Sequence, residues 1–246
     1  MASLGTTTFG VTAGDPFGLN GAIGGVSFAF VGYSETRGKT LVFADKENGE
    51  YTSGTQAAID SRVSISATYR AQTDNGTVTG ATLQLFFTHE STARVIALDS
   101  VVVDCSKGDF AQVTINAHRH EGGSNSNQHN ANAATVPLPN FHSFGCSAFG
   151  VDVNVNEAAL QSSTYTLRVT HKDETNSGGN FLCGSSFGVT ASVSLEAIDS
   201  YDWGDPDGWI ATSRDAQPRQ SNTTHQSRQV TFERHLVKNN AGTAYA

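Results

Sequence analysis

Charged side chains are scarce in this 246-residue chain. Asp, Glu, Lys and Arg together make up 15% of the residues, whereas soluble domains usually hold about 25%. Acids outnumber bases, with 23 Asp and Glu against 15 Lys and Arg, and the formal net charge is −8. Binding to a phosphate backbone needs a basic surface, so we expect no specific nucleic-acid binding. A weakly charged surface is typical of proteins whose surfaces meet other protein surfaces rather than bulk water.

Cysteine is also rare. The three cysteines, Cys105, Cys146 and Cys183, are an odd number and lie far apart in the sequence. This excludes a disulfide framework and a zinc site built on closely spaced thiolates. The N-terminus lacks the basic start and apolar run of a signal peptide, and no stretch is long and apolar enough for a transmembrane helix. We therefore expect no secretion and no membrane partner.

Several signatures of common enzymes are missing too. The chain contains no phosphate-binding loop, no dinucleotide-binding fingerprint and no His-Glu-x-x-His pair of a metalloprotease. Carboxylate pairs that could cleave glycosides cannot be recognised without geometry. We therefore predict a protein that is not an enzyme, with no catalytic residues and no cofactor.

The hydrophobic pattern predicts an all-β chain, folded as an antiparallel β-sandwich or barrel with long loops and extended N- and C-terminal arms. Apolar and polar residues alternate with a period of two in many short segments. Residues 1–25 are rich in glycine and predict an extended N-terminal arm. Residues 26–213 form the expected β-domain, and residues 214–246 are expected to be a basic C-terminal arm. A single helical turn is predicted at residues 57–62.

Three consecutive strands, at residues 82–88, 94–104 and 110–118, are expected to form the centre of this domain. The middle strand is apolar at both parities, with Val101 and Val103 on one face and Ile96 and Leu98 on the other. This pattern is typical of a strand that is covered on both sides. We therefore predict that it is a central strand.

A polar stripe follows the third of these strands and ends in two histidines. Gln112, Thr114, Asn116, His118 and His120 share one parity, so His118 and His120 point the same way, as two metal ligands would. A third histidine, His129, follows in the glycine- and asparagine-rich segment 122–134. The His118-Arg119-His120 sequence is similar to the His-x-His motif of cupins, although a Glu and a Gly follow it at once instead of several residues later. The resemblance implies a metal site on His118, His120 and His129. The alternative is that these are polar residues on an exposed or inter-subunit face, and we expect no bound metal.

Both tryptophans of the chain lie in one short segment with three aspartates, at residues 202–209. Trp203 and Trp209 are candidates for an interface anchor or for a platform that stacks on sugars, together with Asp205 and Asp207. Core packing is the alternative. Within this segment Pro206 and Gly208 predict a tight turn.

Charge is segregated along the last third of the sequence. Residues 173–213 contain acids but neither Lys nor Arg, and the segment 214–246 is mainly basic. The two segments are candidates for ionic pairing, within one chain or between subunits. The basic interface candidates are Arg214, Arg219, Arg228 and Arg234.

The run DCSKGDFAQVTINAH, at residues 104–118, resembles β-rich tail and virion proteins of bacteriophages. The resemblance implies a β-sandwich or barrel protomer that assembles with copies of itself into rings or a lattice, and that has no active site. We therefore expect a structural subunit of a virion or phage-like particle, of the tail-tube or capsid type, that assembles in the host cytoplasm with itself and with other virion proteins. The alternatives are a carbohydrate-binding or adhesive β-sandwich, and a cupin-like metal-binding protein.

Overall fold

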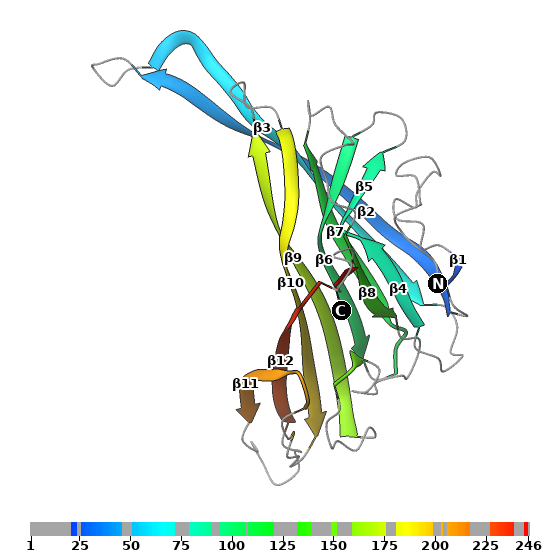
Figure 1. The fold of residues 1–246 in the computed structure, drawn as a ribbon. Helices are drawn as coiled ribbons and strands as arrows, with labels where there is room; N and C mark the ends of the chain where they lie inside the picture. Colours follow the sequence, from blue (N-terminus) through cyan, green and yellow to red (C-terminus); the bar gives the residue numbers. More distant parts are fainter. Residues whose placement is uncertain are drawn as a thin grey trace.

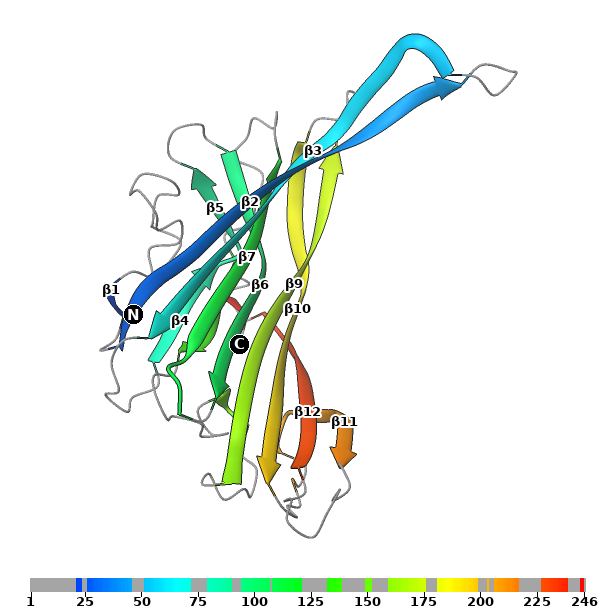
Figure 2. The ribbon, with the colours of Figure 1, turned by 180° about the vertical axis from the view of Figure 1, so that it is seen from behind.

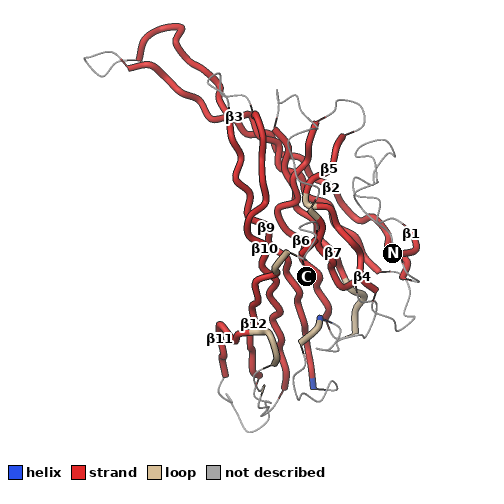
Figure 3. Tube along the Cα trace, viewed as in Figure 1, coloured by secondary structure: helices blue, strands red, loops and turns tan. Residues whose placement is uncertain are grey.

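The computed structural model confirms an all-β fold (Figures 1 and 3). Among the residues it describes, no helix has the length and hydrophobicity needed to cross a membrane. The structure describes residues 21–23, 26–45, 51–71, 79–89, 94–106, 108–120, 132–138, 149–151, 159–175, 181–198, 203, 206–216, 227–238 and 244–245.

The described strands belong to two sheets. The strands are β1 (Gly21–Ile23), β2 (Val26–Asp45), β3 (Tyr51–Ala71), β4 (Thr79–Gln84), β5 (Phe86–His89), β6 (Arg94–Ser106), β7 (Gln112–His120), β8 (Ala133–Leu138), β9 (Leu160–Thr175), β10 (Phe181–Ile198), β11 (Ile210–Ala216), β12 (Ser227–Leu236) and β13 (Ala244–Tyr245). The larger sheet has the order β1-β2-β3-β7-β6-β9-β10-β12-β11, with β5 also paired to β6. The smaller sheet has the order β13-β8-β4.

The two sheets pack as a sandwich around one hydrophobic core. Leu83, Val136 and Tyr245 from the smaller sheet share this core with residues of the larger one. The chain passes between the sheets at Leu85, whose N–H donates to the carbonyl of Asn132 (2.8 Å) and whose carbonyl accepts from the N–H of Leu98 (2.8 Å). The larger sheet is open, because its strand order ends at β1 on one side and at β11 on the other. Of the two architectures expected from the sequence, this favours the sandwich.

Strand β6 is central, as its sequence predicts, but a β-bulge changes the assignment of its faces. The strand pairs with β7 on one edge and with β9 on the other. Its register against β7 shifts between Leu98 and Ser100. The extra residue, Asp99, reverses the alternation of side chains along β6. Ile96 and Leu98 before the bulge therefore point to the same face of the sheet as Val101 after it. The apolar residues at both parities therefore belong largely to one buried face. The other face is covered only in part, at Ala97 and the neighbouring His118.

Two hairpins extend beyond the body of the sandwich as two-stranded ribbons. Strands β2 and β3 continue to pair from Thr40↔Ile59 to Asp45↔Tyr51, whereas β7 pairs with β3 only between Arg62 and Arg70. Figures 1 and 2 show this ribbon projecting past every other strand. Residues 57–62 are extended within β3, so the predicted helical turn is wrong. The β9–β10 hairpin forms a shorter ribbon from Ser186↔His171 to Phe181↔Thr175.

The segment that was expected to be a C-terminal arm contains strands of both sheets. Strand β12 lies between β10 and β11, and its Val230 and Phe232 are fully buried. Strand β13 pairs with β8 in the smaller sheet. Residue 214 therefore does not separate an arm from the domain, because alternating apolar side chains place β12 in the core despite the basic residues around them. Most of the expected N-terminal arm lies outside the described residues, apart from β1, which pairs with β2.

Candidate functional site

The candidate site forms where β9 separates from β6. Their pairing runs from Ser106 to Ser100, which lies opposite Arg168. Beyond this point β5 takes the place of β9 along β6, from Ala97 to Arg94. Strand β9 continues into the β9–β10 ribbon, and the Asp99 bulge lies at the same level. Side chains of β6, β7 and β9 therefore meet at this point, which we call the fork. Its residues are Asp99, His118, His120, His171 and Asp173.

His118 is buried between two carboxylates at this fork. Only 1% of its side chain is exposed. Its Nδ1 lies 2.6 Å from Oδ1 of Asp99, and its Nε2 lies 3.2 Å from Oδ2 of Asp173. The guanidinium of Arg62 lies 3.4 Å from both oxygens of Asp99. The bulge is thus what brings Asp99 to the face of the sheet that carries His118.

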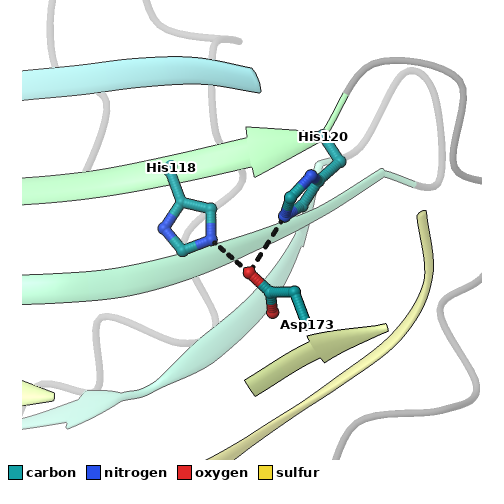
Figure 4. Close-up of side chains that lie close together, drawn as sticks. All are labelled: His118, His120 and Asp173. Carbon is teal, nitrogen blue, oxygen red and sulfur yellow. Dashed lines mark hydrogen bonds and ion pairs between the residues drawn. The ribbon is translucent and has the colours of Figure 1, made fainter. Parts of the chain in front are cut away.

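His120 converges on the same carboxylate oxygen (Figure 4). Its Nε2 lies 3.1 Å from Oδ2 of Asp173, and the ring centroids of the two histidines are 5.3 Å apart. The prediction that His118 and His120 point the same way is confirmed. One ligand atom from each of His118, His120 and Asp173 lies within 4.8 Å of the other two. The second carboxylate oxygen of Asp173, Oδ1, is buried and has no hydrogen-bond partner among the described residues.

The charges at the fork follow from burial and hydrogen bonding. Burial disfavours the imidazolium form of His118, but the hydrogen bonds to Asp173 and Asp99 outweigh it and raise the pKa above the ordinary value. Burial alone would raise the pKa of Asp173, yet the two histidines hold it far below its usual range. Burial lowers the pKa of His171, whose Nε2 donates to the carbonyl of Leu98 (2.7 Å). The two carboxylates therefore favour the charged form of His118, whereas burial favours the neutral form of His171.

The polar face of the sheet continues from the fork into an open groove. Asp99 lines this groove together with hydroxyl and amide side chains of β2, β3 and β7, and its volume is about 350 Å³. Its polar lining residues are Ser34, Thr36, Ser64, Ser66 and Asn116. The fork therefore borders a solvent-facing surface, although its histidines are buried.

Two of the five fork residues, His118 and His120, were predicted from the sequence, whereas Asp99, His171 and Asp173 were not. His129, the third predicted ligand, lies outside the described residues. Asp173 was noted only as part of an acidic segment, but His171 and Asp173 repeat on β9 the same i, i+2 spacing that singled out His118 and His120. That spacing was the available signal. Asp99 carried none, because its position depends on the bulge.

The two tryptophans are core residues rather than exposed anchors. Trp203 and Trp209 are 4% and 5% exposed. The indole Nε1–H of Trp209 donates to the carbonyl of Gly150 (2.8 Å), and the guanidinium of Arg234 lies 4.7 Å from its ring centre. Neither ring is available as a sugar-stacking platform, so this expectation was wrong, because the core of the sandwich reaches the segment around them. The predicted turn is confirmed by the Trp209 N–H to Pro206 carbonyl bond (3.1 Å) and the positive φ of Gly208, 75°.

The remaining interface candidates are charged residues. Asp207 and Arg214 are exposed, and Arg228 and Arg234 are half-buried on β12. Asp205 and Arg219 lie outside the described residues. Arg214, Arg228 and Arg234 lie on the neighbouring strands β11 and β12.

Residues 184–188 match the Gly-x-Ser-x-Gly pattern of nucleophilic serines. In active sites of that kind the serine sits on a sharp turn between a strand and a helix. Here the pattern lies inside strand β10, paired with β9. Ser186 is buried, and its Oγ accepts a hydrogen bond from Nδ2 of Asn132 (3.1 Å). The serine therefore joins the larger sheet to the start of β8 and lacks the nucleophile geometry.

Comparison with known proteins adds no relatives. No protein-family model matches the sequence, and no curated protein matches it.

Proposed function

We propose that this chain is a non-enzymatic structural subunit that assembles with copies of itself, as subunits of virions and phage tails do. The β2–β3 ribbon is the observation that carries the proposal. From Thr40 to Asp45 it consists of two strands, and no third described strand pairs with it.

A two-stranded ribbon gains little stability in water by itself. Isolated hairpins are marginal, and independent stability needs three or more strands or packing against another element. Strands 20 and 21 residues long are also far above the usual length of about five or six residues. A second copy of the chain would supply the missing strand partners or packing surface for the ribbon.

Exposed apolar side chains on the outer strands support the same conclusion. Edge strands with apolar side chains are surfaces to which another chain can add. Strand β11 ends the larger sheet, and its Ile210 is 72% exposed. Strand β2 pairs with β1 only from Val26 to Phe28, and it exposes Val31 and Tyr33 farther along. Phe187, in the part of β10 that β12 does not reach, is 64% exposed.

The scarcity of charge fits such a role. Interface cores are depleted in charged residues, and only 15% of this chain is charged. The carbohydrate-binding alternative has lost the aromatic platform on which it depended, since both tryptophans are buried.

A ribbon deletion tests the proposal. Thr40 and Ile59 are cross-strand partners, so residues 41–58 can be replaced by Asn-Gly, which favours a tight two-residue hairpin turn. A matched control replaces only residues 46–50 by Asn-Gly, between the partners Asp45 and Tyr51, and keeps both ribbon strands. Both variants are compared with the unmodified chain by sedimentation velocity and thermal unfolding.

We expect the unmodified chain and the control to form large species, and the ribbon deletion to remain monomeric and folded, with one cooperative thermal transition. A monomeric unmodified chain at high concentration would contradict the proposal. Normal assembly of the ribbon deletion would contradict the role of the ribbon.

A further inference from the structure

We propose that His118, His120 and Asp173 bind a divalent transition-metal ion, with Zn²⁺ as the best fit, and that Asp99 orients His118 toward it. The site would tie β7 to β9 at the point where the β9–β10 ribbon leaves the sheet. The proposal is independent of self-assembly, because it depends only on the side chains at the fork.

The spacing of the ligand atoms already approaches that of a zinc site. Ligand bonds of about 2.0–2.2 Å in a tetrahedron place neighbouring ligand atoms about 3.3 Å apart. Oδ2 of Asp173 lies 3.2 Å from Nε2 of His118 and 3.1 Å from Nε2 of His120. Two of the three edges therefore need almost no change. The third edge, between the two histidines, is at most 4.8 Å, so it is the one that would have to shorten when a metal binds.

The hydrogen-bonding pattern around His118 is the one expected for a metal ligand. A ligating histidine usually donates its other ring N–H to a carboxylate, which fixes the tautomer and the ring orientation. With the proton on Nδ1 donated to Asp99 at 2.6 Å, Nε2 directs its lone pair toward Asp173 and His120. Arg62, 3.4 Å from Asp99, holds this outer carboxylate in turn.

The carboxylate of Asp173 points independently to a missing partner. Its Oδ1 is buried and finds no hydrogen-bond partner in the part of the chain that the structure describes, although buried carboxylate oxygens are normally satisfied. Without a metal, both imidazoles must be protonated at Nε2 to bond the single oxygen Oδ2. A cation at the centre of the triangle replaces these two protons, is bound by both lone pairs, and brings a charge close to Oδ1.

The donor set selects the class of metal. Two imidazole nitrogens and one carboxylate oxygen suit Zn²⁺, Co²⁺ or Ni²⁺, whereas Mg²⁺ and Ca²⁺ prefer oxygen ligands. Three protein ligands leave a fourth position for water or a further side chain. The consequence for the fold is mechanical, because no described backbone pairing joins β9 to β6 beyond Ser100, and a metal bridge from β7 to Asp173 would hold the ribbon there.

Isothermal titration calorimetry of the chelator-treated full chain with ZnCl₂ tests the site. We expect one Zn²⁺ per chain, a higher unfolding temperature in its presence, and no comparable effect of MgCl₂. His120→Gln and Asp173→Asn should remove this binding. Asp99→Asn should weaken it about 10- to 100-fold, as is typical when an outer partner of a ligand is lost. His235→Ala, at an exposed histidine of β12, is the matched control and should bind as the unmodified chain does.

Bound Co²⁺ provides a second measurement, because its visible absorption reports a low-coordinate site, and circular dichroism confirms that each variant is folded. Absence of stoichiometric Zn²⁺ binding by the unmodified chain would overturn the proposal. Undiminished binding by folded His120→Gln and Asp173→Asn would overturn it too, since the ion would then lie elsewhere.

Discussion

Truncation of Phe232 to alanine should strongly destabilise the fold. Phe232 is fully buried on β12, where it lies opposite Val193 of β10 and Ala211 of β11. Removal of a buried aromatic ring costs about 3 to 5 kcal/mol, through lost burial and the cavity that remains. For a chain of this size each kcal/mol lowers the unfolding temperature by about 2 to 4 °C. The unfolding temperature of Phe232→Ala should therefore be about 6 to 20 °C lower than that of the unmodified chain.

Urea unfolding, monitored by tryptophan fluorescence, measures the expected decrease in the free energy of unfolding, because Trp203 and Trp209 are both buried in the folded state. His235→Ala, on the same strand but exposed, is the matched control and should change the free energy of unfolding by less than about 0.5 kcal/mol. Equal stability of Phe232→Ala and the unmodified chain would refute the placement of β12 in the core. It would restore the expectation of a detachable C-terminal arm.

Three further changes test other parts of the fold. Val101→Asp should abolish folding, seen as loss of the β signal in circular dichroism, because Val101 is fully buried in central β6 and an unpaired buried charge is very costly; a folded variant would show that β6 is misplaced. Burial raises the pKa of Tyr165 to about 12, so the neutral phenol is favoured in the folded state. The stabilisation from the neutral phenol should be fully present below pH 10, and the free energy of unfolding should fall by about 1.4 kcal/mol per pH unit between pH 10 and 12. In urea unfolding, the free energy of unfolding of Tyr165→Phe should therefore fall less steeply with pH than that of the unmodified chain. Equal slopes would contradict the raised pKa. Gly208→Ala should cost about 1 to 2 kcal/mol because φ is 75° there, whereas Gly32→Ala, with no heavy atom within 4 Å of the added Cβ, should not; equal thermal stability of the two variants would count against the turn.

Alternation along single strands was a good guide to the fold. In β7 the buried residues Val113, Ile115 and Ala117 alternate with the polar stripe that ends in His118 and His120, as the sequence predicts. The tight turn at Pro206 to Trp209 was also predictable, because proline and glycine restrict or extend the allowed backbone angles locally.

Features that depend on distant parts of the chain were not predictable. The bulge at Asp99 adds one residue to β6. The predicted faces of this strand were wrong in part because they assumed strict alternation along its whole length. Strand β12 was expected to lie in an arm because the segment around it is mainly basic. Nothing in its own sequence shows that it pairs with β10. Asp173 reaches His118 across 55 positions of sequence, so only the fold could join the two halves of the fork.

Electron microscopy of the purified, unmodified chain tests the central claim most directly. If the β2–β3 ribbon exists to pack against neighbouring copies, concentrated protein should form rings, tubes or shells of regular diameter. A field of separate particles, each the size of one 25.9 kDa chain, would contradict it.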